Sequence, residues 1–353
     1  MKILGIETSC DETAASVVQD GRRMLSNIVA SSMDLHAKYG GVVPEIAARS
    51  HIEAILPVII GALEQAGCTW DDIDGIAVTN GAGLGGSLLI GVLTARTLAI
   101  THHKPLYAIN HVMGHVYANF LTETALPDYH MRTSQPEFPM LAIIVSGGHS
   151  QLALFRNHFD YRLLGQTQDD AIGEAFDKVA KILGLPYPGG PSVAEAAELG
   201  NPETFKLPKA KMPKPYDFSF SGLKTAVLRL AQVQIGESYD FPSTKLAERL
   251  SEAQKVDIAA SFQRTAVATI VDKTVSAFRE FSPTSVVIAG GVAANQELRR
   301  QLTTALPLIV QYPDIKLCTD NGAMIATLGC FTADSGLSPA DPYTLGIAPN
   351  LSM

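Results

Sequence analysis

The chain has 353 residues, which is enough for two domains with separate cores, and its 46% hydrophobic and 18% charged residues are typical of a soluble α/β protein. Its net charge of −8 argues against nucleic acid as a partner of the surface as a whole. Its four cysteines form no Cys-x-x-Cys pair, which excludes a disulfide framework or a thiolate zinc site and indicates a reducing compartment.

The N-terminus does not resemble a signal peptide, because acidic residues follow from Glu7 onward. The most apolar stretch, residues 87–100, is interrupted by Arg96 and is too short to span a bilayer. We therefore expect a cytoplasmic protein that is not bound to a membrane.

Each half of the chain begins with a predicted β-hairpin. Residues 2–8 are expected to form a strand, Ser9–Thr13 a polar turn and residues 14–18 a second strand. The same pattern recurs at residues 140–155 around the turn Ser146–Ser150. Two such hairpins at the starts of similar halves indicate an internal duplication.

Strands and helices alternate elsewhere, which predicts an α/β fold with mixed sheets. The predicted domains are residues 1–125 and 140–353, with an interdomain stretch near residues 126–139, and a helix at the C-terminus could return to the first domain. The predicted helices lie at residues 52–66, 87–100, 171–183, 258–281 and 295–306, and the predicted strands at residues 75–79, 106–109 and 285–289.

His111 and His115 are the first candidate site residues. Residues four apart lie on one face of a helix, where two imidazoles can share a metal ion. The zinc-protease pattern has a Glu directly after the first His, but this chain has Val112. A metal held here would therefore hold or polarise a substrate. Taken alone, two core histidines at this spacing are the commoner explanation.

Asp320 is a candidate third ligand. It closes the strand-like residues 317–319 and precedes a predicted helix at residues 321–326. An aspartate at this position most often caps the helix. The alternative is a two-His, one-carboxylate site with open positions, which suits iron(II) or zinc.

Three glycine-rich loops could bind an anion or a flat ligand. The turn Ser146–His149 offers unobstructed backbone N–H groups, although Ser-Gly-Gly is also simply a good hairpin turn. Residues 288–295 run from a strand through two glycines into a helix that Asn295 could cap. Residues 186–191 form a loop rich in proline and glycine after a helix that contains Asp177.

Gly81-x-Gly83-x-x-Gly86 matches the dinucleotide-binding fingerprint, but the next strand is not followed by an acidic residue for a ribose hydroxyl. We interpret these glycines as a sign of close helix–sheet packing. Four lysines, Lys206, Lys209, Lys211 and Lys214, form one basic loop. A solvated surface loop is the simpler interpretation, and any contact with nucleic acid would be local.

Eight motifs, in order along essentially the whole chain, resemble those of the bacterial TsaD proteins. These are tRNA threonylcarbamoyladenosine transferases that were once described as O-sialoglycoprotein endopeptidases. The motifs are Glu7–Thr13, His111-x-x-x-His115, Val145–His149, Glu174–Lys178, Tyr187–Pro191, Phe218–Thr225, Gly290–Asn295 and Cys318–Ala323.

The resemblance implies a duplicated actin-like (ASKHA, RNase H-like) α/β fold, with two domains and a nucleotide cleft between them. It implies one divalent metal, Fe²⁺ or alternatively Zn²⁺, bound by His111, His115 and Asp320. It places the proposed acid–base carboxylate at Glu12. The residues it implies for contact with threonylcarbamoyl-AMP, or with ATP or ADP, are Ile144, Val145, Ser146, Gly147, Gly148, His149, Asp177, Gly190 and Asn295. Many relatives have an Asp where this chain has Ala194, which puts a ribose contact there in doubt.

The resemblance also implies a reaction and partners. A metal-dependent acyltransferase would move the threonylcarbamoyl group from threonylcarbamoyl-AMP to N6 of the adenosine beside the anticodon, in tRNAs that read codons beginning with A. Bacterial relatives act with TsaB, a paralogue, with TsaE, an ATPase, and with TsaC, which makes the adenylate. The alternatives are a metalloprotease, an actin-fold ATPase or kinase, and a scaffold without catalytic activity in a tRNA-modifying complex.

Overall fold

The computed structural model describes the whole chain, Met1–Met353, as two compact units. Unit 1 comprises Met1–Pro136 and Tyr312–Met353, and unit 2 comprises Glu137–Gln311. The predicted second domain therefore differs from unit 2 at its C-terminal end. Helix α11 (Gly322–Asp334) lies in unit 1, which is the return that the sequence allowed for a C-terminal helix.

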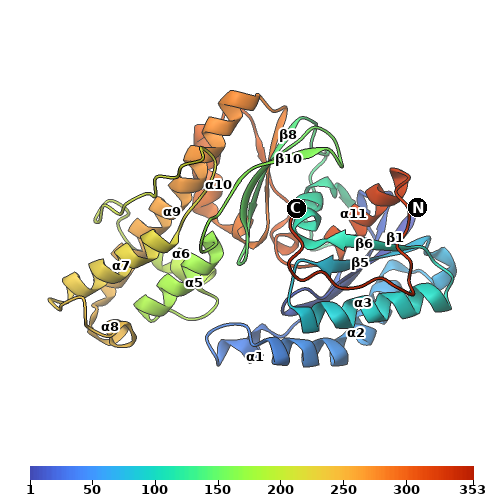
Figure 1. Ribbon diagram of the computed structural model, residues 1–353, viewed down its shortest axis with the longest axis horizontal. Coiled ribbons are helices and arrows are strands. Elements are labelled where there is room, and N and C mark those ends of the chain that lie inside the picture. Colours follow the sequence, from blue (N-terminus) through green and yellow to red (C-terminus); the bar gives the residue numbers. More distant parts are fainter. The chain divides into compact units, whose positions relative to one another are not determined.

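Unit 1 is built on a seven-stranded mixed sheet with the strand order β6-β5-β1-β2-β3-β7 and with β4 beside β2 (Figure 1). β1 and β2 are antiparallel and form the first predicted hairpin, which is confirmed. β1, β5 and β6 run parallel, so their carboxyl ends meet at one edge of the sheet. The strands are β1 (Lys2–Glu7), β2 (Glu12–Gln19), β3 (Arg23–Met24), β4 (Ile28–Ser31), β5 (Gly75–Gly81), β6 (Leu106–Asn110) and β7 (Glu123–Thr124).

Helices cover both faces of this sheet. α2 (Pro44–Ala66) and α3 (Gly85–Thr101) pack on one face, where Leu4 and Ile6 of β1 belong to the same buried cluster as Ile55 and Val92. α11 packs on the other face, together with α4 (His111–Tyr117). Successive strand residues point to opposite faces, which is why Gly5, between Leu4 and Ile6, faces α11. The short helix α1 (Met33–Ala37) follows β4.

A close approach at Gly5 sets the position of α11. A Cβ atom on Gly5 would lie 2.3 Å from the carbonyl oxygen of Gly322, and one on Gly322 would lie 2.5 Å from the backbone nitrogen of Ser16. Only glycine at both positions lets the first turn of α11 rest directly on β1 and β2. Asp320 precedes α11 by two residues and is therefore carried to the hairpin.

α2 is the one helix that is long and apolar enough to cross a membrane, by length and composition alone. Its buried face, with His51, Ile55 and Ile59, packs against the sheet of unit 1. A core helix of a soluble protein passes the same test, so this property is weak evidence for a membrane segment. The helix begins at Pro44, eight residues before its predicted start, because proline suits the first helical position.

Unit 2 contains a five-stranded sheet with the order β10-β9-β8-β11-β12. β8 and β9 form the second predicted hairpin, which is confirmed, and β11 pairs parallel to β8. The strands are β8 (Met140–Val145), β9 (Ser150–Phe155), β10 (Tyr161–Gln166), β11 (Ser285–Ala289) and β12 (Val310–Gln311). The helices are α5 (Ile172–Leu183), α6 (Gly189–Glu198), α7 (Ser221–Gln234), α8 (Leu246–Arg249), α9 (Glu252–Phe281) and α10 (Gln296–Ala305).

Two local predictions were wrong. Residues 317–319 are not a strand, because Ile315–Leu317 form a 3₁₀ turn whose start is capped by Asp314, which accepts a hydrogen bond from Lys316 N. Residues 186–191 are not wholly a loop, since α6 begins at Gly189 directly after Pro188. A short 3₁₀ helix, Gly291–Ala294, also precedes α10.

Candidate functional site

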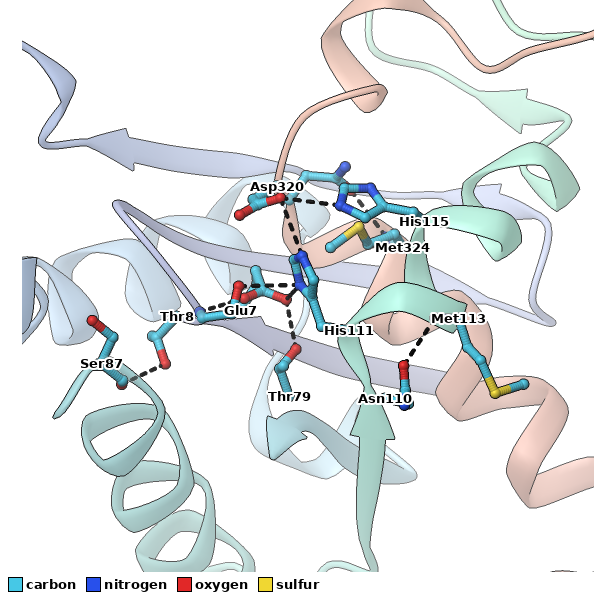
Figure 2. Close-up of polar contacts among 12 residues, drawn as sticks. Glu7, Thr8, Thr79, Ser87, Asn110, His111, Met113, His115, Asp320 and Met324 are labelled. Atoms are coloured by element: carbon cyan, nitrogen blue, oxygen red, sulfur yellow. Dashed lines mark hydrogen bonds and ion pairs between the residues drawn. The ribbon is translucent and has the colours of Figure 1, made fainter. Parts of the chain in front are cut away.

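His111 is the first residue of α4, which begins directly at the end of β6, and His115 lies one turn further along in its last turn. Asn110 caps this helix by accepting a hydrogen bond from Met113 N at 3.1 Å. The His111 and His115 ring centroids are 4.7 Å apart. In Figure 2 both rings point toward the Asp320 carboxylate. The cap and the four-residue spacing together place the two imidazoles side by side.

The structure brings Asp320 to both histidines. Its Oδ1 lies 3.6 Å from His111 Nε2 and 3.2 Å from His115 Nε2. One ligand atom from each of the three residues lies within 4.8 Å of the others. This grouping joins residues that are about two hundred positions apart in the sequence, and a single metal ion could contact all three.

Asp320 is not the N-cap of α11, so that interpretation was wrong. The cap is Asn321, whose Oδ1 accepts a hydrogen bond from Met324 N at 2.9 Å. The Asn321 side-chain amide also donates to Thr319 O at 2.7 Å, which fixes the backbone just before Asp320. Because Asn321 satisfies the helix terminus, the Asp320 carboxylate is left to face the histidines.

His115 provides the test of whether these residues fit a metal. Its side chain is buried, with 2% of its surface exposed, yet neither ring nitrogen makes a hydrogen bond with the protein. Apart from the contact of Nε2 with Asp320, this buried imidazole has no polar partner, which is costly, and a cation between Nε2 and Asp320 would supply one. Two imidazoles and one carboxylate with open positions suit Fe²⁺ or Zn²⁺. The residues therefore fit the implied metal.

Glu7 supports His111 from behind and was not predicted as a site residue. Its fully buried carboxylate lies 3.1 Å from His111 Nδ1 and accepts hydrogen bonds from Ser9 N and Thr79 Oγ1, both at 2.5 Å (Figure 2). Ser9 Oγ is also 3.1 Å from His111 Nδ1. With Nδ1 engaged in this way, Nε2 faces Asp320. The sequence could have indicated this contact only by position, because Glu7 ends β1, His111 follows β6, and both strands end at the same edge of the sheet.

The charge of His111 depends on these carboxylates. Burial opposes protonation, but the negative charges of Asp320 and Glu7 outweigh it and raise the pKa of His111 to about 9. Without a cation, His111 is therefore protonated at neutral pH. A metal ion would take the place of that proton.

Glu12 is the first residue of β2 and is 9% exposed. Its Oε1 accepts a hydrogen bond from Ser31 Oγ at 3.2 Å. Burial raises the pKa of Glu12 to about 9, and the negative charges of Asp320 and Asp11 add to the effect. Because Asp320 contributes to this shift, Glu12 and the three-residue group share one electrostatic environment.

Contacts from other elements hold the turn between β1 and β2. The buried His51 of α2 lies 2.8 Å from Thr13 Oγ1 and 3.0 Å from the Cys10 carbonyl oxygen. A Cβ atom on Gly83 would lie 2.6 Å from the carbonyl oxygen of Ser9. We expected these fingerprint-like glycines to serve helix–sheet packing. Instead, Gly83 lets the turn pack closely against it, and Gly81 does the same for the C-terminal tail.

The turn Ser146–His149 in unit 2 is open. Ser146 N donates to His149 O at 2.8 Å, and His149 N donates to Ser146 Oγ at 3.1 Å. Gly147 and Gly148 are exposed, and a Cβ atom on either would meet nothing within 4 Å. A ligand can therefore approach the backbone of this turn closely, and glycine turns of this kind bind anions through their N–H groups. The strand residues Ile144 and Val145 that precede the turn are fully buried.

The remaining predicted ligand residues of unit 2 differ in how far other parts of the protein already engage them. Asp177 accepts a hydrogen bond from Gly189 N at 2.7 Å, and burial raises its pKa. Gly190 has open space beside it. Asn295 caps α10 by accepting from Leu298 N at 3.0 Å and donates to Gln263 Oε1 at 2.8 Å, so its amide already has protein partners.

The family model described as TsaD, tRNA N6-adenosine threonylcarbamoyltransferase, matches residues 23–327. The chain belongs to the TsaD family. It is 53% identical to the tRNA N6-adenosine threonylcarbamoyltransferase of Thermomicrobium roseum over 96% of this chain and 93% of that protein. It is 48% identical to the protein of the same name from Dehalococcoides mccartyi, over 100% and 99% of the two chains.

Solved structures show the fold. HypF in a phosphate- and nucleotide-bound form aligns with 96% of this chain and 47% of its own chain, with a TM-score of 0.56 and 14% identity. HypF of T. kodakarensis aligns with 97% of this chain and 49% of its own chain, with a TM-score of 0.57 and 14% identity. The fold is the duplicated actin-like α/β fold that the TsaD-like motifs implied, and that prediction is confirmed.

Proposed function

We propose that this chain transfers the threonylcarbamoyl group from threonylcarbamoyl-AMP to N6 of the adenosine beside the anticodon, in tRNAs that read codons beginning with A. The observation that carries this proposal is the similarity over almost the whole length to relatives named for this transfer. The grouping of His111, His115 and Asp320 supports it, because the ligand atoms of these residues lie close enough together to bind one cation.

A divalent cation bound by His111, His115 and Asp320, Fe²⁺ or alternatively Zn²⁺, would orient the threonylcarbamoyl group and polarise its carbonyl. The chain supplies what such a cation needs around it. Glu7 holds His111 through Nδ1, and Asn321 keeps the backbone before Asp320 in place. A carboxylate behind a metal-binding imidazole fixes its orientation and makes it a better ligand.

The proposed reaction is an acyl transfer. The adenosine amine attacks the carbamoyl carbon, the bond from that carbon to the phosphate oxygen breaks, and AMP leaves. The amine is a poor nucleophile because its lone pair is delocalised into the purine ring, so removal of its proton is required. In its deprotonated form Glu12 accepts this proton, and the raised pKa makes that carboxylate a stronger base.

Unit 2 contributes the adenylate contacts of this proposal. The N–H groups of Gly147 and Gly148 bind the phosphate, within the segment Ile144–His149, because the space beside both glycines is open. Gly190 leaves open space for the nucleotide, and Asp177 fixes the start of α6 through Gly189. Asn295 acts mainly by capping α10. ATP or ADP could bind through the same phosphate contacts.

The proposed partners are tRNA, TsaB and TsaE, with TsaC supplying the adenylate, and the proposed location is the cytoplasm. An apolar face on unit 1 supports a protein partner. Ile52, Leu56 and Ile60 of α2 are 54–61% exposed, and Leu89 and Leu93 of α3 are 43% and 45% exposed. Exposed apolar patches of this kind mark protein interfaces. We assign this α2–α3 face to the paralogue TsaB.

The alternatives lack support. A metalloprotease needs a general base next to the first histidine, and Val112 occupies that position. A kinase or ATPase has no use for the buried histidine pair. The deciding experiment is reconstitution with threonylcarbamoyl-AMP, the partner proteins and unmodified tRNA, followed by mass spectrometry of the nucleosides. Formation of threonylcarbamoyladenosine supports the proposal, and its absence with all components present would refute it.

A further inference from the structure

A basic segment, residues 205–216, crosses the surface of unit 2. It contains Lys206, Lys209, Lys211 and Lys214, and no acidic residue occurs from Thr204 to Tyr216. The concentration of positive charge is notable because the chain as a whole carries a net charge of −8. Neither the proposed metal site nor the adenylate contacts use this segment.

The basic segment is held along α9 instead of hanging free (Figure 1). Phe205 N donates to Ser261 Oγ at 3.2 Å at one end, and Lys273 Nζ donates to Pro215 O at 2.6 Å at the other. Between them, Lys209 forms an ion pair with Asp272 at 2.6 Å. These anchors span about 18 Å of α9, at a rise of about 1.5 Å per residue. Prolines within the segment restrict it further.

Three of the four lysines are left without a carboxylate partner. Lys206, Lys211 and Lys214 are exposed and take part in no ion pair. The acidic residues nearest the anchors are largely engaged, since Asp272 pairs with Lys209 and Glu203 pairs with Arg264 at 2.6 Å. The outcome is three unpaired lysines on an anchored backbone, and the anchoring lowers the entropic cost of binding a polyanion.

We propose that the basic segment is a docking surface for the phosphate backbone of tRNA. This inference rests on the proposed function, which makes tRNA the substrate. Spaced lysines bind successive phosphates as point charges without reading sequence. An anionic membrane fits less well, because membrane-binding segments expose apolar side chains, whereas Leu207 and Met212 are half-buried here.

The test is binding of fluorescently labelled, unmodified tRNA to the full chain, measured by anisotropy over a series of salt concentrations. The substituted protein carries Lys206→Ala, Lys211→Ala and Lys214→Ala. We expect its Kd at about 50 mM salt to rise at least about tenfold, and its salt slope to fall by about 2 to 3, since each phosphate contact contributes about 0.7–0.9. The assay needs no donor, metal or partner protein, so its outcome is independent of the transfer reaction.

A matched control removes the same charge elsewhere through Lys104→Ala, Lys181→Ala and Lys245→Ala, none of which forms an ion pair. We expect this control to bind tRNA nearly as the unmodified chain does. An unchanged Kd and slope in the first variant, an equal loss in the control, or no tRNA binding by the unmodified chain at low salt would each overturn the proposal. Binding to phosphatidylglycerol vesicles that depends on the segment, with tRNA binding unaffected, would overturn it in favour of a membrane.

Discussion

At the scale of single residues, two buried glutamates, Glu7 and Glu12, have different roles in the site. Glu7 orients His111 through Nδ1, whereas Glu12 is kept close to its protonated form by burial and by Asp320 and Asp11. Both belong to one short motif, but their neighbours give them different tasks. The sequence motif could not separate the two roles, because the contact of Glu7 with His111 exists only once β1, β5 and β6 are paired.

Glu7→Gln should weaken metal binding. The neutral amide cannot replace the carboxylate behind His111, and loss of such a partner typically reduces metal affinity by about 10–100-fold. Chelator competition with Zn²⁺, together with thermal melting without metal to confirm folding, measures this effect. Glu45→Gln, at an exposed position on α2, is the matched control. Unchanged affinity in a folded Glu7→Gln protein would remove Glu7 from the metal site.

Glu12→Gln should slow transfer strongly and yet leave the fold as stable or more stable. The folded pKa of Glu12 is raised to about 9 from an ordinary value near 4.5, so the folded state keeps a proton that the unfolded state has lost. Stability from this group therefore declines as pH rises from about 4.5 to about 9, and a neutral amide removes that decline. Thermal melting of metal-free protein at about pH 8 should show an equal or higher Tm than the unmodified chain.

In the same variant, loss of a general base should slow transfer by about 10²–10⁴-fold. The unmodified enzyme should become faster as pH rises toward 9, because more Glu12 is deprotonated, and the variant should lose this rising limb. A full transfer rate in Glu12→Gln would exclude Glu12 as the base. A lower Tm at about pH 8 would contradict the raised pKa.

At the scale of elements, the periodic parts of the sequence were predictable and the irregular parts were not. Both hairpins and the strand at residues 285–289 were predicted because their apolar runs end at small polar turns. Residues 317–319 were misassigned, because the cap from Asp314 and the 3₁₀ turn it starts leave no periodic signal. The same limit hid the true cap of α11, where Asp320 and Asn321 are equally plausible until the chain is folded.

The close packing of α11 on β1 should make both stability and metal affinity sensitive to the side chain at position 5. Gly5→Ala should displace the start of α11, since the new Cβ would lie 2.3 Å from the Gly322 carbonyl oxygen. We expect a loss of stability of about 1–3 kcal/mol in urea unfolding, from overpacking. Metal affinity should fall as well, because Asp320 moves with the helix. Gly346→Ala, with nothing within 4 Å, is the control and should leave both quantities unchanged.

The apolar α2–α3 face should be required for complex formation with TsaB. Leu56→Asp, at a position 57% exposed, should prevent complex formation with TsaB without unfolding the chain. Size-exclusion chromatography of the mixed proteins, with circular dichroism of the variant alone, measures both effects. Glu53→Gln, exposed on the same helix, is a control that should retain the complex. A complex of unchanged affinity with Leu56→Asp would move the partner to another surface.

At the scale of the whole molecule, the duplicated fold could be predicted from two copies of one hairpin pattern. A return of a C-terminal helix to the first domain was allowed for, but its extent, residues 312–353, could not be predicted, because it depends on the packing of α11 on β1 and β2 and leaves no local pattern. That return is also what supplies the third candidate ligand. The metal site is therefore a property of the complete chain, and neither half of the sequence holds it alone.

In the proposed function, the His111, His115 and Asp320 group serves threonylcarbamoyl transfer through a bound cation. Its most direct test is nucleoside mass spectrometry of tRNA in the reconstituted reaction after chelation and re-addition of Fe²⁺ or Zn²⁺. We predict that chelation abolishes modification, and that the metal restores it in the unmodified chain but not in His115→Ala. Full modification by the chelated enzyme, or by His115→Ala, would contradict a role of the bound cation in transfer.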